Sequence, residues 1–171
     1  MKKLLKVLGI LLLVSTMFAC SGGGAEVTPD PKKDLKEIDS GTGFKIWADK
    51  NINKEDMEGY DLFAYEDDCA FSVLREDFTL LEEYELADAD TTLEEYAEII
   101  GEANGISLAK DKYGELSATY TAESEGNNFW YYSVVRKGSE SFWLVSFFCL
   151  AEDQATYEDQ FGLWASTIET E

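Results

Sequence analysis

The spacing of apolar residues divides the chain into three parts. Residues 1–19 consist of a basic head and an almost purely aliphatic run from Val7 to Val14. Residues 20–42 are rich in glycine, proline and charged residues and show no regular apolar spacing. From Gly43 onward, apolar residues recur with the periods of strands and helices. The pattern therefore predicts a folded domain over residues 43–171, a flexible linker over residues 20–42 and a separate leader.

Seven segments of the predicted domain have the composition of β-strands, and turn residues separate them. Ser141–Leu150 is the most apolar segment and is expected at the centre of a mainly antiparallel sheet. In the segment 115–122, apolar and polar residues alternate, so one side of this strand is expected to face water. The seven segments span residues 44–47, 60–65, 69–74, 106–112, 115–122, 128–136 and 141–150.

Two further segments have the period of helices. The first begins at Thr91, where Glu94 completes a capping box, and it ends at Gly105, which suits a left-handed stop. Its apolar stripe consists of Leu93, Tyr96, Ala97, Ile100 and Ala103. The second runs from about Asp153 to Thr167 and has aromatic residues at helical spacing. These elements predict an α+β domain, in which a mainly antiparallel sheet is flanked by two helices.

The leader has the features of an export signal: a basic head, a short apolar run and a small residue before the cut. Cys20 follows Ala19, and Met17-Phe18-Ala19-Cys20 resembles the lipobox of bacterial lipoproteins. The resemblance implies cleavage before Cys20 and acylation of Cys20 with palmitate-like chains. Two or more acyl chains hold a protein firmly in a membrane, whereas one binds only marginally. We therefore expect a lipid-anchored protein on the extracytoplasmic face of the cell membrane.

The same leader has two alternative interpretations. A plain secretory signal would leave Cys20 as an ordinary residue, and an uncleaved leader would serve as a transmembrane anchor. The apolar run from Val7 to Ala19 is shorter than the roughly 20 residues that a spanning helix needs. The glycines at positions 22–24 make a loose tether just after the cut, which favours the lipoprotein.

The mature chain carries a strongly negative charge. Residues 1–19 contain three lysines and no acidic residue, so cleavage leaves 11 basic against 35 acidic residues, a net charge of −24. Such a surface repels nucleic acids and anionic lipid headgroups, so we expect neither as a partner. The chain also contains no histidine. This excludes Ser-His-Asp and Cys-His catalysis and the metal and haem sites that need imidazole, and we expect no cofactor.

Cys69 and Cys149 are the other two cysteines. They are too far apart in the sequence for a metal motif, but an exported protein can keep a disulfide between them. The alternative is a pair of small buried apolar side chains, which free cysteines often are. A bridge requires Cα atoms within about 7 Å of each other. Whether the two strands are neighbours therefore decides whether a disulfide is possible.

Acidic residues are candidates for metal binding and for hydrolysis. The segment 88–92 resembles the start of a calcium loop, but an EF-hand would need glycine and glutamate where this chain has Leu93 and Ile99. The acidic runs at 66–68 and 82–85 are more typical of solvated loops than of cation sites. Two carboxylates can hydrolyse a glycoside, yet among 35 acidic residues a close pair arises by chance. We expect no metal site and no enzymatic activity.

The order of the elements resembles the PsbP-like family of α/β/α sandwiches, which is named after an extrinsic photosystem II protein and also includes small bacterial lipoproteins. The resemblance covers about residues 43–168. The segments that carry it are 43–46, 92–97, 142–147 and 157–168. These are core positions, so the resemblance implies a fold and transfers no functional residue. A cystatin-like or NTF2-like domain is the alternative, but the helix after the last strand argues against both.

Three classes of function fit these features. We favour a membrane-anchored, non-catalytic module of the cell envelope that binds a protein or a small ligand. The alternatives are a structural or accessory lipoprotein without a small ligand, and an envelope hydrolase that uses carboxylates. An exposed Trp or Tyr on the sheet would favour the binding module, whereas a cleft with two close, pKa-shifted carboxylates would favour the hydrolase. The aromatic candidates for a glycan or peptide groove, most of them expected in the core, are Trp130, Tyr131, Tyr132, Trp143 and Trp164.

Overall fold

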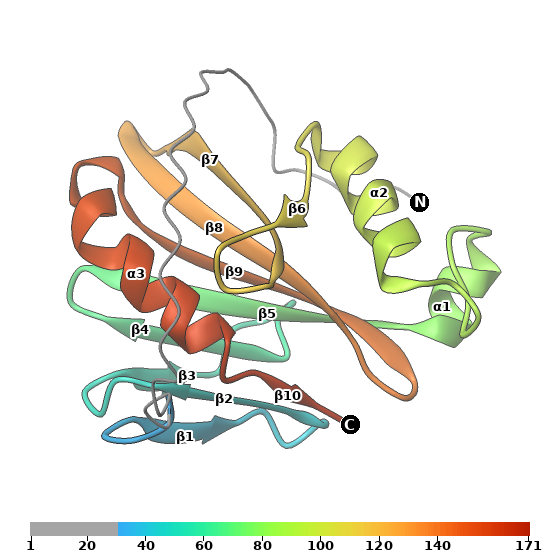
Figure 1. The fold of residues 1–171 in the computed structure, drawn as a ribbon, viewed down its shortest axis with the longest axis horizontal. Helices are drawn as coiled ribbons and strands as arrows, with labels where there is room; N and C mark the ends of the chain where they lie inside the picture. Colours follow the sequence, from blue (N-terminus) through green and yellow to red (C-terminus); the bar gives the residue numbers. More distant parts are fainter. Residues whose placement is uncertain (1–30) are drawn as a thin grey trace, which may run out of the picture.

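A computed structural model describes residues 31–171 as two antiparallel sheets with three helices (Figure 1). The smaller sheet has the strand order β1 (Lys36–Asp39), β2 (Phe44–Ala48) and β10 (Glu169–Thr170). The larger sheet has the order β3 (Asn53–Glu55), β4 (Leu62–Glu66), β5 (Cys69–Asp77), β9 (Ser141–Leu150), β8 (Asn127–Lys137), β7 (Leu116–Ser124) and β6 (Ala109–Lys110). The α+β class and the mainly antiparallel pairing are therefore confirmed, with β9 at the centre of the larger sheet.

The helices are α1 (Phe78–Glu83), α2 (Leu93–Asn104) and α3 (Gln154–Ala165), the last preceded by a 3₁₀ turn at Ala151–Asp153. None of the helices between residues 31 and 171 is long and apolar enough to cross a membrane. The short helix α1 was not predicted, because its six residues offer less than two turns of periodic pattern.

One face of the larger sheet packs against α3 and β2. Alternate residues of β9 point to this face, and Val145 and Phe147 are fully buried there. The ring of Phe147 lies 5.4 Å from that of Phe161 in α3. Trp164, also in α3, lies with its ring 6.3 Å from that of Phe71 in β5. The predicted aromatic stripe of the last helix thus forms the main core, where α3 lies across the strands (Figure 1).

The opposite face is covered by α2 over one end only. Phe142 precedes Trp143 in β9 and therefore points to the other side of the sheet. Tyr96 of α2 stacks on Phe142 with parallel rings 4.0 Å apart, and Val135 and Ile100 complete the contact. Because α2 and α3 occupy opposite faces, the domain is an α/β/α sandwich. The other half of this face, where β9 continues toward Leu150, lies outside this second core.

The cap of α2 differs from the predicted one by one residue. The side chain of Thr92 accepts a hydrogen bond from the Glu95 amide at 3.2 Å, and the Glu95 carboxylate accepts from the Thr92 amide at 2.8 Å. The predicted pair, Thr91 and Glu94, is wrong because the Thr91 hydroxyl is already bonded to Asp88, 3.0 Å away. The left-handed stop at Gly105 is confirmed, with φ of 66°.

The fold also begins earlier than Gly43. Residues predicted as linker form β1, which pairs with β2 and places Ile38 directly opposite Ile46. Ile38 is 5% exposed, and Leu35 packs against the same core. The predicted linker of 20–42 therefore overlaps the domain from about Leu35. A single buried isoleucine among charged residues produces no alternation that a sequence could reveal.

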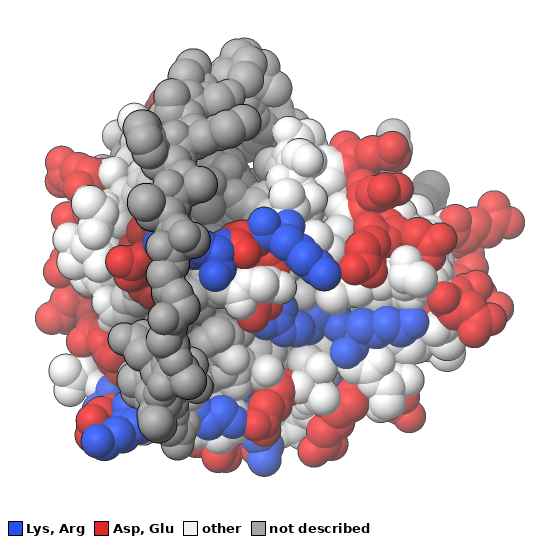
Figure 2. All heavy atoms as spheres, viewed as in Figure 1, with Lys and Arg blue, Asp and Glu red and all other residues white. Residues whose placement is uncertain are grey.

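Charge is distributed unevenly over the surface. Figure 2 shows acidic side chains along most of the outline, with basic side chains gathered in the middle of the same face, between α3 and α2. Many basic side chains of the described residues have acidic neighbours: Arg75 pairs with Asp77, Lys112 with Asp159 and Arg136 with Glu115. Lys137 donates to the carbonyl oxygens of Ala89 and Thr91, both at 2.7 Å. This gathering of cations is therefore a poor candidate for an anion site.

Candidate functional site

The predicted lipidation site, Cys20, lies outside the described residues. The other two cysteines occupy directly opposed positions of the adjacent strands β5 and β9. Opposed residues of antiparallel strands have Cα atoms about 4.5–5.5 Å apart, which is within the range of a disulfide. Both thiols are free and buried, and burial raises the pKa of Cys69 to about 12 and that of Cys149 to about 11. The geometry therefore allows both alternatives, a bridge and a pair of buried thiols.

The acidic segments considered for metals are spread apart. Within residues 31–171, no three or more Cys, Asp or Glu side chains are arranged to hold a metal ion. The Asp88 carboxylate, in the segment that resembles a calcium loop, accepts from the amides of Asp90 and Thr91, both at 2.9 Å. These bonds hold the approach to α2 and leave one oxygen of Asp88 for solvent.

Asp111 and Glu115 are two neighbouring carboxylates with opposite pKa shifts. Burial raises the pKa of Glu115, although its ion pair with Arg136 opposes the rise. Burial also acts on Asp111, but hydrogen bonds from Tyr132 and other groups outweigh it and lower the pKa of Asp111. Neither carboxylate lines the hollow between β3 and β4 or the hollow at the turn between β4 and β5. Both oxygens of Asp111 accept hydrogen bonds within the protein and Glu115 is paired with Arg136, so the two carboxylates are better explained as a structural network than as a hydrolytic site.

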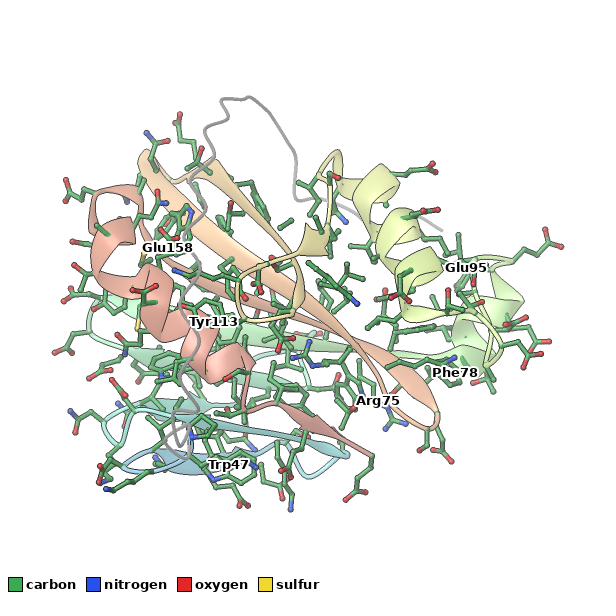
Figure 3. The ribbon with its side chains drawn as sticks, in the orientation of Figure 1. Trp47, Arg75, Phe78, Glu95, Tyr113 and Glu158 are labelled. Atoms are coloured by element: carbon green, nitrogen blue, oxygen red, sulfur yellow. The ribbon has the colours of Figure 1, made fainter. Side chains whose placement is uncertain are left out.

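This network secures the loop between β6 and β7 against α3. Figure 3 shows Tyr113 in this loop beside α3, with Glu158 on the same helix. The Tyr113 hydroxyl donates to Asp159 at 2.8 Å. A Cβ atom at Gly162 would lie 2.0 Å from the Tyr113 ring, so only glycine permits this close approach. The loop is thus part of the packed core layer rather than an open lid.

Four of the five aromatic candidates lie in the core. Trp130, Tyr132, Trp143 and Trp164 are each at most 5% exposed and pack on the α3 side of the larger sheet. Tyr131 instead points to the opposite face, because it alternates with Trp130 and Tyr132 along β8. It belongs there to a larger set of aromatic side chains, most of which were not singled out in the sequence.

We call this set the aromatic surface. Its members share the face opposite α3, beyond the end that α2 covers. They come from β4 and the loop before it, from β9, from β8 and from β7. The aromatic surface consists of Tyr60, Phe63, Tyr65, Tyr120, Phe129, Tyr131 and Phe148.

Strand register aligns part of the aromatic surface in one row across the sheet. Tyr65 is opposite Ala70, Ala70 is opposite Phe148, Phe148 is opposite Tyr131, and Tyr131 is opposite Tyr120. Four inter-strand steps of about 4.8 Å make this row about 19 Å long. The side chain of Ala70 is too small to fill its place in the row, so the ring of Phe63, 6.4 Å from Phe148, bridges β5.

Ring contacts make the aromatic surface continuous. Tyr60 lies 6.3 Å from Phe63, and Tyr131 lies 5.5 Å from Phe148. Tyr120 and Tyr131 stack with their planes 4° apart and their centroids at 5.0 Å. Burial raises the pKa of Tyr120, while hydrogen bonding with Ser133 and Ser146 acts in the opposite direction. The β7 end of the row is therefore a fixed platform.

The β4 end of the row is open to solvent. Tyr60 is 41% exposed and Tyr65 is 40% exposed, while the remaining rings are half-buried. Contiguous apolar patches that are exposed to solvent are typical of binding surfaces. A single exposed ring, by contrast, is a normal outcome of folding. Tyr65 is thus an exposed tyrosine on the sheet, the feature expected to favour a binding module.

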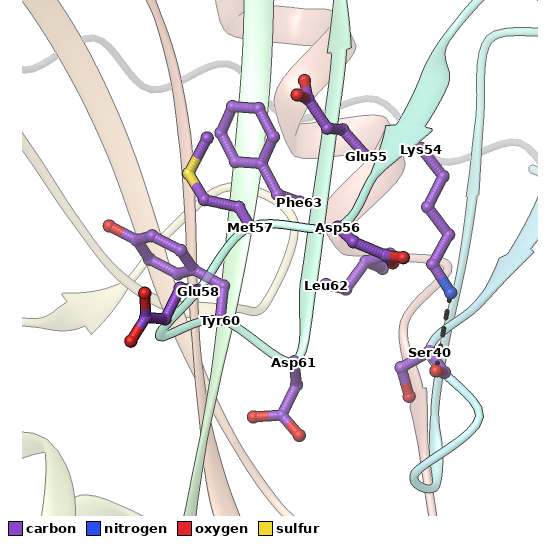
Figure 4. A pocket seen from close by; sticks show the side chains of 10 residues that line it. All are labelled: Ser40, Lys54, Glu55, Asp56, Met57, Glu58, Tyr60, Asp61, Leu62 and Phe63. Atoms are coloured by element: carbon purple, nitrogen blue, oxygen red, sulfur yellow. Dashed lines mark hydrogen bonds between the residues drawn. The ribbon is translucent and has the colours of Figure 1, made fainter.

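Two hollows border the open end. The first, of about 300 Å³, lies between β3 and the loop before β4, where Figure 4 shows Met57, Tyr60 and Phe63 on one side. The second, of about 220 Å³, lies at the turn between β4 and β5, with Tyr65, Phe129 and Phe148 among its lining residues. Both hollows combine aromatic walls with carboxylates. The carboxylates are Glu55, Asp56, Glu58 and Asp61 in the first hollow and Glu66, Asp67 and Asp68 in the second.

Comparisons with known proteins support the fold and leave the function open. No protein-family profile and no curated protein sequence matches the chain. A crystal structure of a Bacteroides thetaiotaomicron VPI-5482 protein matches with a TM-score of 0.53 and 15% identity, over 81% of this chain and 49% of that one. This chain thus spans about half the length of that protein. The solution structure of cyanobacterial PsbP from Synechocystis matches with a TM-score of 0.48 and 11% identity, over 87% and 98% of the two chains.

Proposed function

We propose that the chain is a bacterial lipoprotein of PsbP-like fold, anchored by acyl chains on Cys20 at the extracytoplasmic face of the cell membrane, and that its domain is a non-catalytic binding module. The leader and its lipobox-like end support the anchor. The α/β/α architecture agrees with the family that the sequence resembles. The absence of histidine from the sequence, the hydrogen bonds to both oxygens of Asp111 and the ion pair of Glu115 with Arg136 argue against hydrolysis.

The aromatic surface is the observation that carries the binding role. A purely structural lipoprotein has no need to leave Tyr60 and Tyr65 exposed beside half-buried rings, since burying an aromatic side chain stabilises a fold by about 1.5–3 kcal/mol. We therefore favour a module that receives a partner on this face over an accessory protein without a ligand.

The anchor is tested by changing its cysteine. Cys20→Ser should move the protein from the membrane to the soluble fraction and abolish incorporation of labelled palmitate, while Cys69→Ser should leave both unchanged. Intact-mass analysis of the membrane-extracted protein should show acyl chains on a chain that begins at Cys20. An unmodified Cys20 at the N-terminus would contradict the lipoprotein assignment.

The binding role is tested by site-specific cross-linking in cells. A photo-reactive amino acid in place of Tyr65 should give a discrete adduct, and Tyr131→Ser should weaken that adduct. The same amino acid in place of Tyr84, which is 60% exposed at the C-terminal end of α1, should give none. Equal labelling from both positions would show that exposure alone accounts for the adduct.

A further inference from the structure

We propose that the aromatic surface binds an extended, positively charged segment of another protein, with Lys or Arg side chains entering the two hollows at its open end. This inference rests on the proposed binding role and names the chemistry of the partner.

The shape of the surface fits an extended chain. The row from Tyr65 to Tyr120 is about 19 Å long, which corresponds to about six residues at 3.3 Å each. The rings form a broad strip across several strands instead of a closed cavity. A strip of this kind offers contact to a series of side chains, and a single small molecule would leave most of it uncovered.

The charge of the two hollows selects a cation. Their lining includes seven carboxylates, whereas Lys54 is the one basic residue lining either hollow in the described chain. The ammonium of Lys54 donates to the carbonyl oxygens of Asp39 at 2.9 Å and Ser40 at 3.5 Å, and Figure 4 shows it directed toward Ser40. Lys54 is therefore already engaged by carbonyl oxygens and makes no ion pair with the acidic side chains that line the hollow.

Most of these carboxylates lack a partner inside the domain. Asp61 is the exception, because it accepts from the Arg75 amide at 3.0 Å. The other six side chains make neither an ion pair nor a hydrogen bond with residues 31–171; they are Glu55, Asp56, Glu58, Glu66, Asp67 and Asp68. Elsewhere on the surface, carboxylates such as Asp77 and Asp159 do pair with cations. Six carboxylates without a partner among residues 31–171 thus line the two hollows beside the exposed rings.

Aromatic faces and carboxylates together favour Lys and Arg side chains. A cation over a Tyr or Phe ring gains about 0.5–1 kcal/mol at an exposed site, and its aliphatic stem covers apolar surface. The same carboxylates repel nucleic acids, anionic lipids and acidic peptides. A neutral glycan could stack on the rings but would gain nothing from the acidic lining, so the charge distribution favours the basic segment.

The test uses the mature chain from Cys20 in a neutral detergent and fluorescence anisotropy of labelled peptides at 0.15 M salt. The probe is a 12-residue peptide of alternating arginine and serine, and its matched control has glutamine in place of arginine. We expect the arginine peptide to bind at least about tenfold more tightly than the glutamine peptide, because only its side chains pair with the carboxylates.

Variants separate this site from attraction to the acidic protein as a whole. Tyr65→Ser should weaken binding of the arginine peptide by about threefold, the value of one exposed cation–π contact. Neutralising residues 66–68 with Gln and Asn should weaken it further. The matched controls are Tyr84→Ser and the neutralisation of Glu82, Glu83 and Glu85, which change an exposed tyrosine and three acids elsewhere and should have little effect.

Each outcome decides the proposal. Equal losses from the control variants, or no preference for arginine over glutamine, would overturn it. Binding of a chitin-derived oligosaccharide that depends on Tyr65 but not on residues 66–68 would also overturn it, yet would leave the binding module intact. The cross-linking experiment addresses the binding role separately, since an adduct at Tyr65 requires no particular charge on the partner.

Discussion

Asp111 connects four groups of the loop and sheet through one carboxylate. One oxygen accepts from the amides of Tyr113 at 2.8 Å and Glu115 at 3.0 Å. The other accepts from the hydroxyl groups of Ser117 at 3.0 Å and Tyr132 at 2.5 Å. An asparagine can supply only one of these two acceptors, since its NH₂ group must donate. Asp111→Asn should therefore leave two donors unsatisfied and lower the free energy of unfolding by about 1–3 kcal/mol at pH 7.

The effect of Asp111→Asn should depend on pH in a defined direction. The folded-state pKa of Asp111 is lowered, so the ionised carboxylate adds stability above the unfolded-state pKa of about 3.9. That contribution disappears as the pH falls through the folded-state pKa. Urea unfolding at pH 7, 5 and 3 should show the difference between the two proteins shrinking at the lowest pH. Asp67→Asn, which changes an unpaired carboxylate, is the control, and a constant difference for Asp111→Asn would contradict its role.

Cys69 and Cys149 should behave as inert thiols in the folded protein. They are 5% and 1% exposed, and burial, with acidic neighbours, raises the pKa values of both. A thiolate is the reactive form, so we expect no reaction with a thiol reagent until the protein unfolds. Unfolded, unreduced mature protein should then release two thiols. A count of zero would show that Cys69 and Cys149 form a disulfide. Such a disulfide would close a loop of about 80 residues and stabilise the fold by about 4 kcal/mol.

At the level of elements, substitutions at the start of α2 distinguish the observed cap at Thr92 from the predicted cap at Thr91. Thr92→Ala removes the acceptor for the Glu95 amide and should lower the free energy of unfolding by about 1 kcal/mol. Glu95→Gln should weaken the reciprocal bond to the Thr92 amide, whereas Glu94→Gln should have no measurable effect. Thermal unfolding of the three variants tests this assignment. A larger loss from Glu94→Gln would restore the cap predicted at Thr91.

The elements that the sequence predicted well are those with long periodic patterns. Each of these patterns extends over about ten residues: the alternation in β7 and β8, the apolar run of β9 and the aromatic spacing of α3. The missed elements are short or atypical. The strand predicted over residues 106–112 contains only the two residues of β6. The Ile106 amide donates to the Gly101 carbonyl oxygen at 3.0 Å, so the first residue of the predicted strand completes the end of α2 instead.

The site was only partly visible in the sequence. Alternation along β8 separates Tyr131 from Trp130 and Tyr132, and this signal alone could have assigned Tyr131 to the less covered face. The partners of Tyr131 depend on which strands are neighbours. Tyr65 and Tyr120 are 55 residues apart in the chain and join one row only through the pairing of five strands. A single sequence does not contain that register.

At the scale of the whole molecule, the small sheet connects the first described residues to the main core. β2 lies between β1 and β10, and its residues Phe44 and Ile46 are fully buried against the main core. Phe44 lies with its ring 5.4 Å from that of Trp143 in the central strand. The first described segment is thus part of the fold, so changes on the N-terminal side of β2 should alter the stability of the domain.

This arrangement predicts where the folded domain begins. A fragment of residues 31–171 should unfold cooperatively with the same stability as the mature chain, because it keeps β1 and the packing of Leu35. A fragment of residues 43–171 loses Ile38, and burial of one such side chain contributes about 1.5–3 kcal/mol. It also exposes the edge of β2, and unpaired edges promote aggregation. We therefore expect a lower melting temperature and concentration-dependent aggregation for the shorter fragment.

The full-length variant Ile38→Ala separates loss of packing from loss of the strand. It keeps the β1 backbone and its pairing with β2, and it removes only the side chain that lies opposite Ile46. A large-to-small change at a buried isoleucine costs about 2–5 kcal/mol. Urea unfolding should therefore show destabilisation without aggregation for Ile38→Ala, and both effects for residues 43–171. Equal stability of the two fragments would instead return residues 31–42 to the linker and place the start of the domain at Gly43.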